Sequence, residues 1–202
     1  MQIEKLTSNL KRKGFKPYFF ENKESAVQFV LDLIPNQASV GFGGSMTVKE
    51  LALDFALKGR GNAVYSYDTV TPQNKDRLHQ LANSSDWYIS STNALSESGD
   101  FVNIDGTANR ICALAYGVKN IVYVLGVNKI ASDLESAIER ARSIACPLNA
   151  KRLNKNTPCV STGECCYCDS EDCICNATLI SHHPTRLQQN VYAIIINENL
   201  GY

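Results

Sequence analysis

The chain has 202 residues, 44% of them hydrophobic, and its 20 basic and 20 acidic side chains leave no formal net charge. A chain of this size can bury a core of its own, which excludes the class of small secreted modules held together by disulfides. The lack of net charge and of any basic run predicts neither nucleic acid nor a membrane surface as a partner.

No export signal or membrane span is predicted. The opening residues Met-Gln-Ile-Glu-Lys are not an apolar signal region. The longest apolar run, Ile121–Val127, is far shorter than the roughly 20 residues that a bilayer requires. We therefore expect a soluble cytoplasmic protein.

Short β-rich runs alternate with helical patterns through the first part of the chain. Ile3, Leu6 and Leu10 have helical spacing, and Gly14 is a stop signal. The next predicted elements are a strand at Phe15–Phe20, a helix from Ala26 to Ile34, a strand at Ala38–Phe42 and a helix that buries Val48, Leu51, Ala52 and Phe55. The sequence Thr47-Val48-Lys49-Glu50 is the predicted capping box of that last helix.

The same alternation continues to the end of the chain. Further strands are predicted at Ala63–Tyr67, Trp87–Ser91, Asn120–Val124 and Val191–Ile196. A helix opened by Ser132-Asp133-Leu134-Glu135 is expected to carry an apolar face up to Ala145, and Pro147 with the polar run Asn149–Asn156 is expected to end the α/β core. This order predicts one α/β domain over residues 1–202, a mostly parallel sheet flanked by helices. A cysteine-rich segment at 151–178 is inserted before the last strand.

Three loops that follow predicted strands hold candidate binding residues, because ligands of open parallel sheets collect at the carboxyl ends of the strands. The first contains Gly43, Gly44 and Ser45. Glycines let backbone amides approach a ligand, and the start of the following helix attracts anions. A tight strand-to-helix turn explains these residues equally well.

The second and third loops add polar and charged candidates. Thr92 and Asn93 suit a small polar ligand, and Glu97 is a candidate base or nucleophile, although solvated capping residues are the plainer interpretation. Asp105, Asn109 and Arg110 occupy the third loop. An arginine in the first turn of a helix opposes the helix dipole, so Arg110 either binds an anion or pairs with a carboxylate, Asp105 or Glu97.

Six of the eight cysteines fall within the 17 residues from Cys159 to Cys175. Such clustering indicates a metal, an iron–sulfur cluster or a disulfide knot, and a reducing cytosol disfavours disulfides. The spacing contains one C-x2-C pair, Cys165 and Cys168, and matches neither a zinc ribbon nor a ferredoxin run, so iron–sulfur and zinc both stay open. Cys112 and Cys146, outside this segment, are expected to be structural, with Cys112 in the core.

Several motifs in order resemble the lactate-utilisation (LUD) domain family over nearly the whole chain. They are G-F-G-G-S-M-T (41–47), S-S-T-N-A-L-S-E-S-G-D (90–100), N-I-D-G-T-A-N-R (103–110), A-K-R-L (150–153), T-P-C-x5-C-x2-C-x6-C from residue 157, and N-E-N-L-G-Y (197–202). The resemblance implies the fold of ribose-5-phosphate isomerase, glucosamine-6-phosphate deaminase and the CoA transferases. It also implies an anion-binding role for Gly43, Gly44 and Ser45, with Glu97 at the acidic position of the next loop.

The resemblance further implies a [4Fe–4S] cluster on Cys159, Cys165, Cys168 and Cys175, with zinc as the alternative. Cys166 and Cys173 depart from the family pattern and are alternative ligands. The implied role is in oxidising a small organic acid such as lactate, or in the associated electron transfer with iron–sulfur redox partner proteins.

Two other functions stay open. One is a ligand-binding or regulatory subunit with structural zinc, and the other is a non-redox transferase or hydrolase related to the CoA transferases. A small anionic molecule is the expected ligand. Whether the chain is an enzyme and whether it forms a homo-oligomer are left open.

Overall fold

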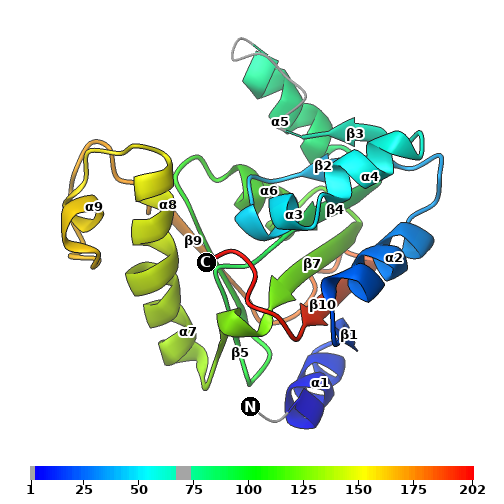
Figure 1. Ribbon diagram of the computed structural model, residues 1–202, viewed down its shortest axis with the longest axis horizontal. Coiled ribbons are helices and arrows are strands. Elements are labelled where there is room, and N and C mark those ends of the chain that lie inside the picture. The colour runs from blue at the N-terminus through cyan, green and yellow to red at the C-terminus, as the bar shows by residue number, and fades with distance from the viewer. Residues whose placement is uncertain (1–2, 67–73) are drawn as a thin grey trace.

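The fold is described from a computed structural model, over residues 3–66 and 74–202. Six parallel strands form the larger of two sheets, in the order β1-β10-β7-β4-β2-β3 (Figure 1). In chain order they are β1 (Lys16–Phe20), β2 (Ser39–Phe42), β3 (Ala63–Tyr65), β4 (Trp87–Ser90), β7 (Asn120–Gly126) and β10 (Asn190–Ile196). Each corresponds to a predicted strand, so the mostly parallel α/β fold is confirmed. Tyr67, the predicted end of the third, lies outside the described residues.

Helices cover both faces of the large sheet. In chain order these are α1 (Ile3–Arg12), α2 (Lys23–Leu33), α3 (Met46–Glu50), α4 (Leu53–Gly59), α5 (Lys75–Asn83) and α6 (Asn109–Ala115). The helices α7 (Leu134–Arg140), α8 (Cys146–Arg152) and α9 (Pro158–Thr162) lie to one side of this sheet (Figure 1), and the first two pack against Ala94, Val102 and Ile104. Side chains alternate between the faces along each strand. Val122 and Val124 of β7 therefore pack in the core under α2, α3 and α4, whereas Tyr123 packs in the core under α1 and α6. No helix among the described residues is long and apolar enough to cross a membrane.

The segment after β2 forms two short helices instead of the single predicted one. Ser45, not Thr47, is the cap of α3, and it accepts a hydrogen bond from the Val48 amide at 3.3 Å. Ala52 adopts a left-handed conformation (φ 49°) and redirects the chain into α4. The prediction that Ala52 and Phe55 are buried is wrong, because this turn exposes Ala52 and rotates Phe55 outward, leaving it 64% exposed.

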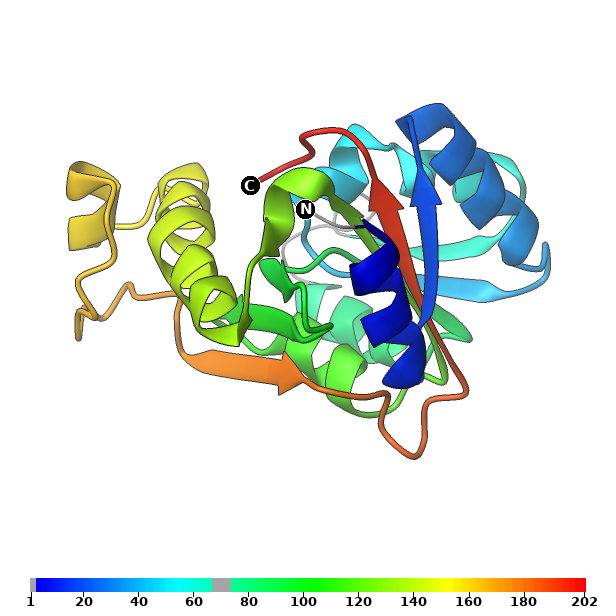
Figure 2. The ribbon, with the colours of Figure 1, turned by 90° about the horizontal axis from the view of Figure 1, so that it is seen from below.

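A second, four-stranded sheet lies beside the first in the order β8-β5-β6-β9 (Figure 2). Its strands are β5 (Ala94–Ser96), β6 (Phe101–Asp105), β8 (Ile130–Ala131) and β9 (Ala177–Ser181). The prediction that residues 90–99 and 103–110 are loops is wrong where β5 and the end of β6 form. The cysteine-rich segment is accordingly followed by two strands, β9 and β10. The sheets are joined through Phe101, whose ring stacks on Tyr123 with centroids 4.2 Å apart.

The helix that begins with α7 continues through Pro147. Between α7 and α8 the chain makes one π-helical segment, η4 (Ala141–Ala145). There the Cys146 amide donates to the Ala141 carbonyl, five residues back. A π segment rearranges the hydrogen bonds of a helix next to a proline, which has no amide proton to donate. The helix therefore runs to Arg152, and Cys146 lies on it.

The last residues of the chain cross the carboxyl ends of the large sheet. Val127 donates its amide to the Glu198 carbonyl at 3.1 Å, and Leu200 donates to the Asn128 side chain at 3.1 Å. Figure 1 shows this segment running from β10 toward α3 and α8. The edge where parallel strands place their ligands is thus lined by the C-terminal tail, residues 197–202.

Gly41 is expected to be indispensable to packing. A Cβ at this position would lie 2.4 Å from the Ala82 carbonyl oxygen and 2.8 Å from Ala82 Cα, where α5 ends against β2. Gly41→Ala should lower the free energy of unfolding by about 2–3 kcal/mol because backbone must shift, a fall in Tm of roughly 5–10 °C in thermal denaturation.

Gly59→Ala is the matched control, because a Cβ there meets nothing within 4 Å. It should be neutral, or stabilise by up to about 1 kcal/mol through helix propensity. Equal Tm values for the two variants would contradict this account of the contact between β2 and α5.

Candidate cysteine cavity and strand-end site

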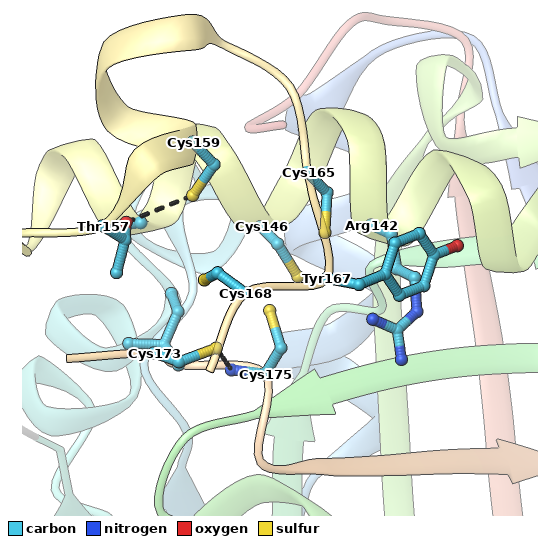
Figure 3. Close-up of a pocket in the computed structure, with 11 residues that line it drawn as sticks. Arg142, Cys146, Thr157, Cys159, Cys165, Tyr167, Cys168, Cys173 and Cys175 are labelled. Carbon is cyan, nitrogen blue, oxygen red and sulfur yellow. Dashed lines mark hydrogen bonds between the residues drawn. The ribbon is translucent and has the colours of Figure 1, made fainter. Parts of the chain in front are cut away.

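Six cysteines line one cavity of about 130 Å³ beside α8, which we call the cysteine cavity. They are Cys146, Cys159, Cys165, Cys168, Cys173 and Cys175. Figure 3 shows their sulfur atoms pointing toward a shared space. All eight cysteines of the chain are free thiols, so the disulfide knot considered from the sequence is not formed.

The cavity wall is built from one helix and one folded loop. Cys146 comes from α8, and Cys159 comes from α9, where its sulfur lies 3.2 Å from the Thr157 hydroxyl. The remaining four thiols come from the loop after Gly163, whose φ of 80° ends α9. Asp172 holds this loop by pairing with Lys155 at 3.1 Å and accepting the Asn156 amide at 2.9 Å.

The crowded thiols oppose one another's ionisation. A hydrogen bond with Cys146, followed by burial, raises the pKa of Cys175 far above its ordinary value. Burial also raises the pKa of Cys173. A metal centre in the cavity would therefore have to displace protons from these thiols as it binds.

Arg142 supplies positive charge at the cavity wall. Its guanidinium stacks on the Tyr167 ring, 4.7 Å from the ring centroid, and both residues line the cavity (Figure 3). Two other cationic side chains near the cysteine-rich segment have partners of their own. Lys155 pairs with Asp172, and Arg152 donates to Asn149 and to the Tyr202 hydroxyl.

A second group of polar residues lies at the carboxyl ends of β2, β4 and β7, and we call it the strand-end site. Arg110 is at its centre. Its Nε donates to Asp105 at 2.7 Å, and its Nη2 donates to the Asn93 side chain at 3.1 Å and to the Ile104 carbonyl at 2.8 Å. The other Asp105 oxygen accepts the amides of Arg110 and Ile111, each at 3.0 Å. Asp105 therefore caps α6 and also neutralises Arg110.

Gly43 is placed by packing against that same arginine. A Cβ at Gly43 would lie 2.4 Å from Arg110 Cγ and 2.8 Å from the Tyr88 hydroxyl oxygen. The absence of a side chain at residue 43 thus lets Arg110 cross beneath β2. Gly44 is exposed, and Ser45 serves as the cap of α3.

Lys129 is the ionisable group of the strand-end site with the largest change in pKa. It ends a short 3-10 helix, η3 (Val127–Lys129), just after β7, and it is 3% exposed. Its Nζ lies 3.2 Å from the Ser91 hydroxyl and 3.3 Å from the Thr92 carbonyl. Burial, and then the charges of Arg140 and Arg110, lower the pKa of Lys129 to about 7.

The comparison with known protein families decides the family. A family model described as the LUD domain matches residues 3–196. The chain belongs to the LUD domain family. A crystal structure of a DUF162 family protein from Deinococcus radiodurans resembles this LUD protein with a TM-score of 0.56 and 11% sequence identity, over 96% of this chain and 95% of that chain. At that identity the likeness shows a shared fold alone. A search of curated proteins finds no match.

Family membership makes this a protein of the lactate-utilisation type, as the motifs predicted. The structure brings Cys159, Cys165, Cys168 and Cys175, the four predicted ligands of the LUD protein, to the cysteine cavity, together with Cys173. Cys166 is exposed and does not line it. Cys112 is exposed on α6, so its predicted place in the core is wrong.

Sequence reasoning missed the contribution of the continuous helix formed by η4 and α8 to the cavity of the LUD protein. Arg142, Cys146 and Ala150 all line it, and their spacing of four residues places them on one helical face. Recognising that the helix continues through Pro147 would have revealed this face. Lys129 was missed as well, although its position just after a predicted strand was a usable signal.

The other predicted residues of the strand-end site are not all brought together. Thr92 donates its hydroxyl to the Ala94 and Val102 carbonyls, both at 2.8 Å, and Asn109 accepts from the Thr107 hydroxyl at 2.9 Å. Glu97 lies in the turn between β5 and β6, where its carbonyl accepts from Asn9 of α1. That turn is four residues along the chain from Asn93, roughly 13 Å at the rise of an extended strand.

The donor set of the cysteine cavity has the chemistry of a soft metal centre, because thiolates are the ligands of iron–sulfur clusters and of structural zinc. No three His, Cys, Asp or Glu side chains within residues 3–66 and 74–202 are grouped so that they could hold one metal ion. A zinc ion needs its sulfurs about 2.3 Å from one point. A cluster spreads its ligands around a larger body, since each thiolate binds a different iron. Six thiols around an open space match the second requirement better.

Proposed function

We propose that this LUD protein binds a [4Fe–4S] cluster in the cysteine cavity and takes part in oxidising a small organic acid such as lactate, or in the electron transfer that serves that oxidation. The observation that carries the proposal is the convergence of six free thiols on one cavity. Only Cys166 of the cysteine-rich segment stands apart from it.

Four thiols that come from two separate elements are the proposed ligands. Cys159 approaches from α9, whereas Cys165, Cys168 and Cys175 approach from the following loop. Cys146 and Cys173 line the same space and are the alternative ligands. When bound, such a cluster accepts and releases single electrons.

The charge of the cavity wall supports an anionic centre. Four thiolates and a cluster carry about two net negative charges. Arg142 lies in the wall, held in place by its contact with the Tyr167 ring. A guanidinium keeps its charge at every physiological pH, so it offsets the cluster without releasing a proton.

The strand-end site is the proposed place for the organic acid. We assign to it the predicted binding residues Gly43, Gly44, Ser45, Thr92, Asn93, Asp105, Asn109 and Arg110. The role of Glu97 in proton transfer stays a prediction from the family resemblance.

One continuous helix joins the two sites. Arg140 of α7 donates to the Asn128 carbonyl at 2.9 Å and to the Asn93 carbonyl at the strand-end site. Cys146 follows six residues later, roughly 9 Å along a helix axis. This helix therefore gives the two sites a direct structural connection.

Redox partner proteins that carry iron–sulfur clusters are the proposed electron acceptors. The cytoplasm is the proposed location, because a reducing compartment keeps eight cysteines as free thiols.

Anaerobic purification followed by metal and sulfide analysis tests the proposal. About four irons and four sulfides per chain are expected, with the broad absorbance near ~400 nm that thiolate-to-iron charge transfer produces. Stoichiometric zinc without iron would support a structural metal in a binding subunit instead. If the chain also fails to take up iron during anaerobic reconstitution with iron and sulfide, the redox proposal is wrong.

A further inference from the structure

Three cationic side chains surround residues 91–93 at the strand-end site. Lys129 contacts Ser91 and the Thr92 carbonyl from η3. Arg140 reaches the Asn93 carbonyl from α7, and Arg110 reaches the Asn93 side chain from α6. The three cations come from different elements, so only the tertiary fold brings them together.

The carboxylates near residues 91–93 do not neutralise all three of these cationic side chains. Asp105 is committed to Arg110 and to the amides that start α6. Glu50 of α3 acts on Lys129 only through longer-range attraction, and its carboxylate accepts the Gly201 amide at 2.9 Å. Within the described part of the chain, no carboxylate forms an ion pair with Lys129 or Arg140. Buried cations normally have a partner, so an anion is expected there.

Asn103 gives an independent indication of a ligand. It is fully buried on β6, and both its amide nitrogen and its amide oxygen lack a hydrogen-bond partner. Alternation along β6 puts it on the same side as Phe101, which faces the large sheet. Its strand also borders residues 91–93, since the Asn93 amide donates to the Val102 carbonyl at 3.1 Å. A buried amide left unsatisfied is costly, and a bound polar molecule would satisfy it.

The C-terminal tail covers Lys129. A Cβ at Gly201 would lie 3.4 Å from Lys129 Nζ and 2.6 Å from the Thr47 hydroxyl. Thr47 in turn donates to the Leu200 carbonyl at 3.1 Å. Together with the bonds that the Leu200 amide donates to Asn128 and the Gly201 amide donates to Glu50, these contacts hold the last residues over the lysine.

We propose that Lys129, Arg140 and Asn103 form the binding site for a small 2-hydroxy or 2-oxo carboxylic acid beneath the C-terminal tail. The carboxylate accepts hydrogen bonds from Lys129 and from Arg140, which gives only two of its five N–H donors to backbone carbonyls. The amide of Asn103 both donates and accepts, so it matches the oxygen on the neighbouring carbon, whether hydroxyl or carbonyl. The class of acid rests on the proposed function, whereas the anion site rests on the geometry alone.

Binding should take up a proton, and this gives the site a signature. A lysine with a pKa of about 7 is largely uncharged at pH 8, and an anion binds its charged form. Affinity should therefore fall by up to about tenfold per pH unit above neutrality. Arginine at the same position stays charged, so Lys129→Arg should bind with little dependence on pH between 6 and 8.

The test is calorimetric titration of the purified full chain with lactate and with pyruvate at pH 6, 7 and 8. Saturable binding that weakens with rising pH is expected for the wild type, with a loss of at least about tenfold in Lys129→Met, since a charge-assisted hydrogen bond contributes that much. Lys58→Met, an exposed lysine of α4, is the matched control and should bind as the wild type does.

No binding of either acid at pH 6, or equal binding by wild type and Lys129→Met, overturns the inference. A thermal melt of each variant shows whether it is folded. The outcome is separable from that of the cluster proposal. Iron without binding of an acid refutes this site alone, whereas Lys129-dependent binding in a protein that takes up no iron refutes the cluster alone.

Discussion

Replacing Cys168 with alanine is expected to remove the iron–sulfur cluster, whereas replacing Cys166 with alanine should leave it in place. The two cysteines are two residues apart, yet Cys168 lines the cavity and Cys166 is exposed outside it. Loss of one of four thiolates opens a coordination position, so iron per chain after anaerobic reconstitution should fall by at least about tenfold in the first variant only. Iron analysis and the absorbance spectrum measure this directly.

Alanine variants of Cys112 and Cys146 provide a further control and a further test of the ligand set. Cys112→Ala, on the far element α6, is a second control and should retain full iron content. Cys146→Ala decides whether α8 supplies a ligand or only part of the wall. If the variants of Cys166 and Cys168 lose iron equally, convergence on the cavity does not identify the ligands, and the proposed ligand set is wrong.

Lys129→Met is expected to stabilise the protein at pH 7. In the folded chain burial lowers the pKa of Lys129 from 10.5 to about 7. At neutral pH the amine is charged in the unfolded chain but must give up much of that charge to be buried in the folded chain. This lowers the free energy of unfolding by on the order of 4 kcal/mol. Methionine removes that cost but also removes two hydrogen bonds, worth about 1 kcal/mol each. The net gain should be roughly 2 kcal/mol, or about 4–8 °C in Tm.

The gain should depend on pH in a defined direction. Between pH 7 and pH 10.5 the unfolded chain binds the proton that the folded chain has released, so the wild type gains stability relative to the variant as pH rises. From pH 7 to pH 9 the difference should shrink by about 2–3 kcal/mol. Melts of wild type, Lys129→Met and the exposed control Lys58→Met at both pH values measure it. A difference that does not change with pH would mean that Lys129 stays charged in the folded protein.

The strands of the large sheet were predictable because parallel strands buried on both faces appear as continuous apolar runs. Ile121–Val124 and Val191–Ile196 are such runs, and both are central strands of the sheet. The second sheet was not predictable in this way. Ala94–Ser96 and Phe101–Asp105 are short and partly polar, and they are strands because Ser96 and Asp100 bond to each other and β6 pairs with the distant β9.

The helix around Pro147 shows a related limit. A proline inside a helical pattern normally marks its end. Here η4 rearranges the backbone hydrogen bonds just before the proline, and Cys146 donates to Ala141. Local sequence rules do not describe such a π-helical segment.

The amino-acid sequence by itself determined the α/β class, the order of the strands along the chain, the family motifs and the cysteine-rich segment, because apolar periodicity and residue identity are local properties. Only the tertiary structure decided that Cys146 and Arg142 share the cavity with that segment, that Asp105 neutralises Arg110, and that Lys129 is buried among cations. These outcomes depend on distances between elements remote in sequence and on the loss of water around charged groups. Both arise only when the helices and sheets pack together.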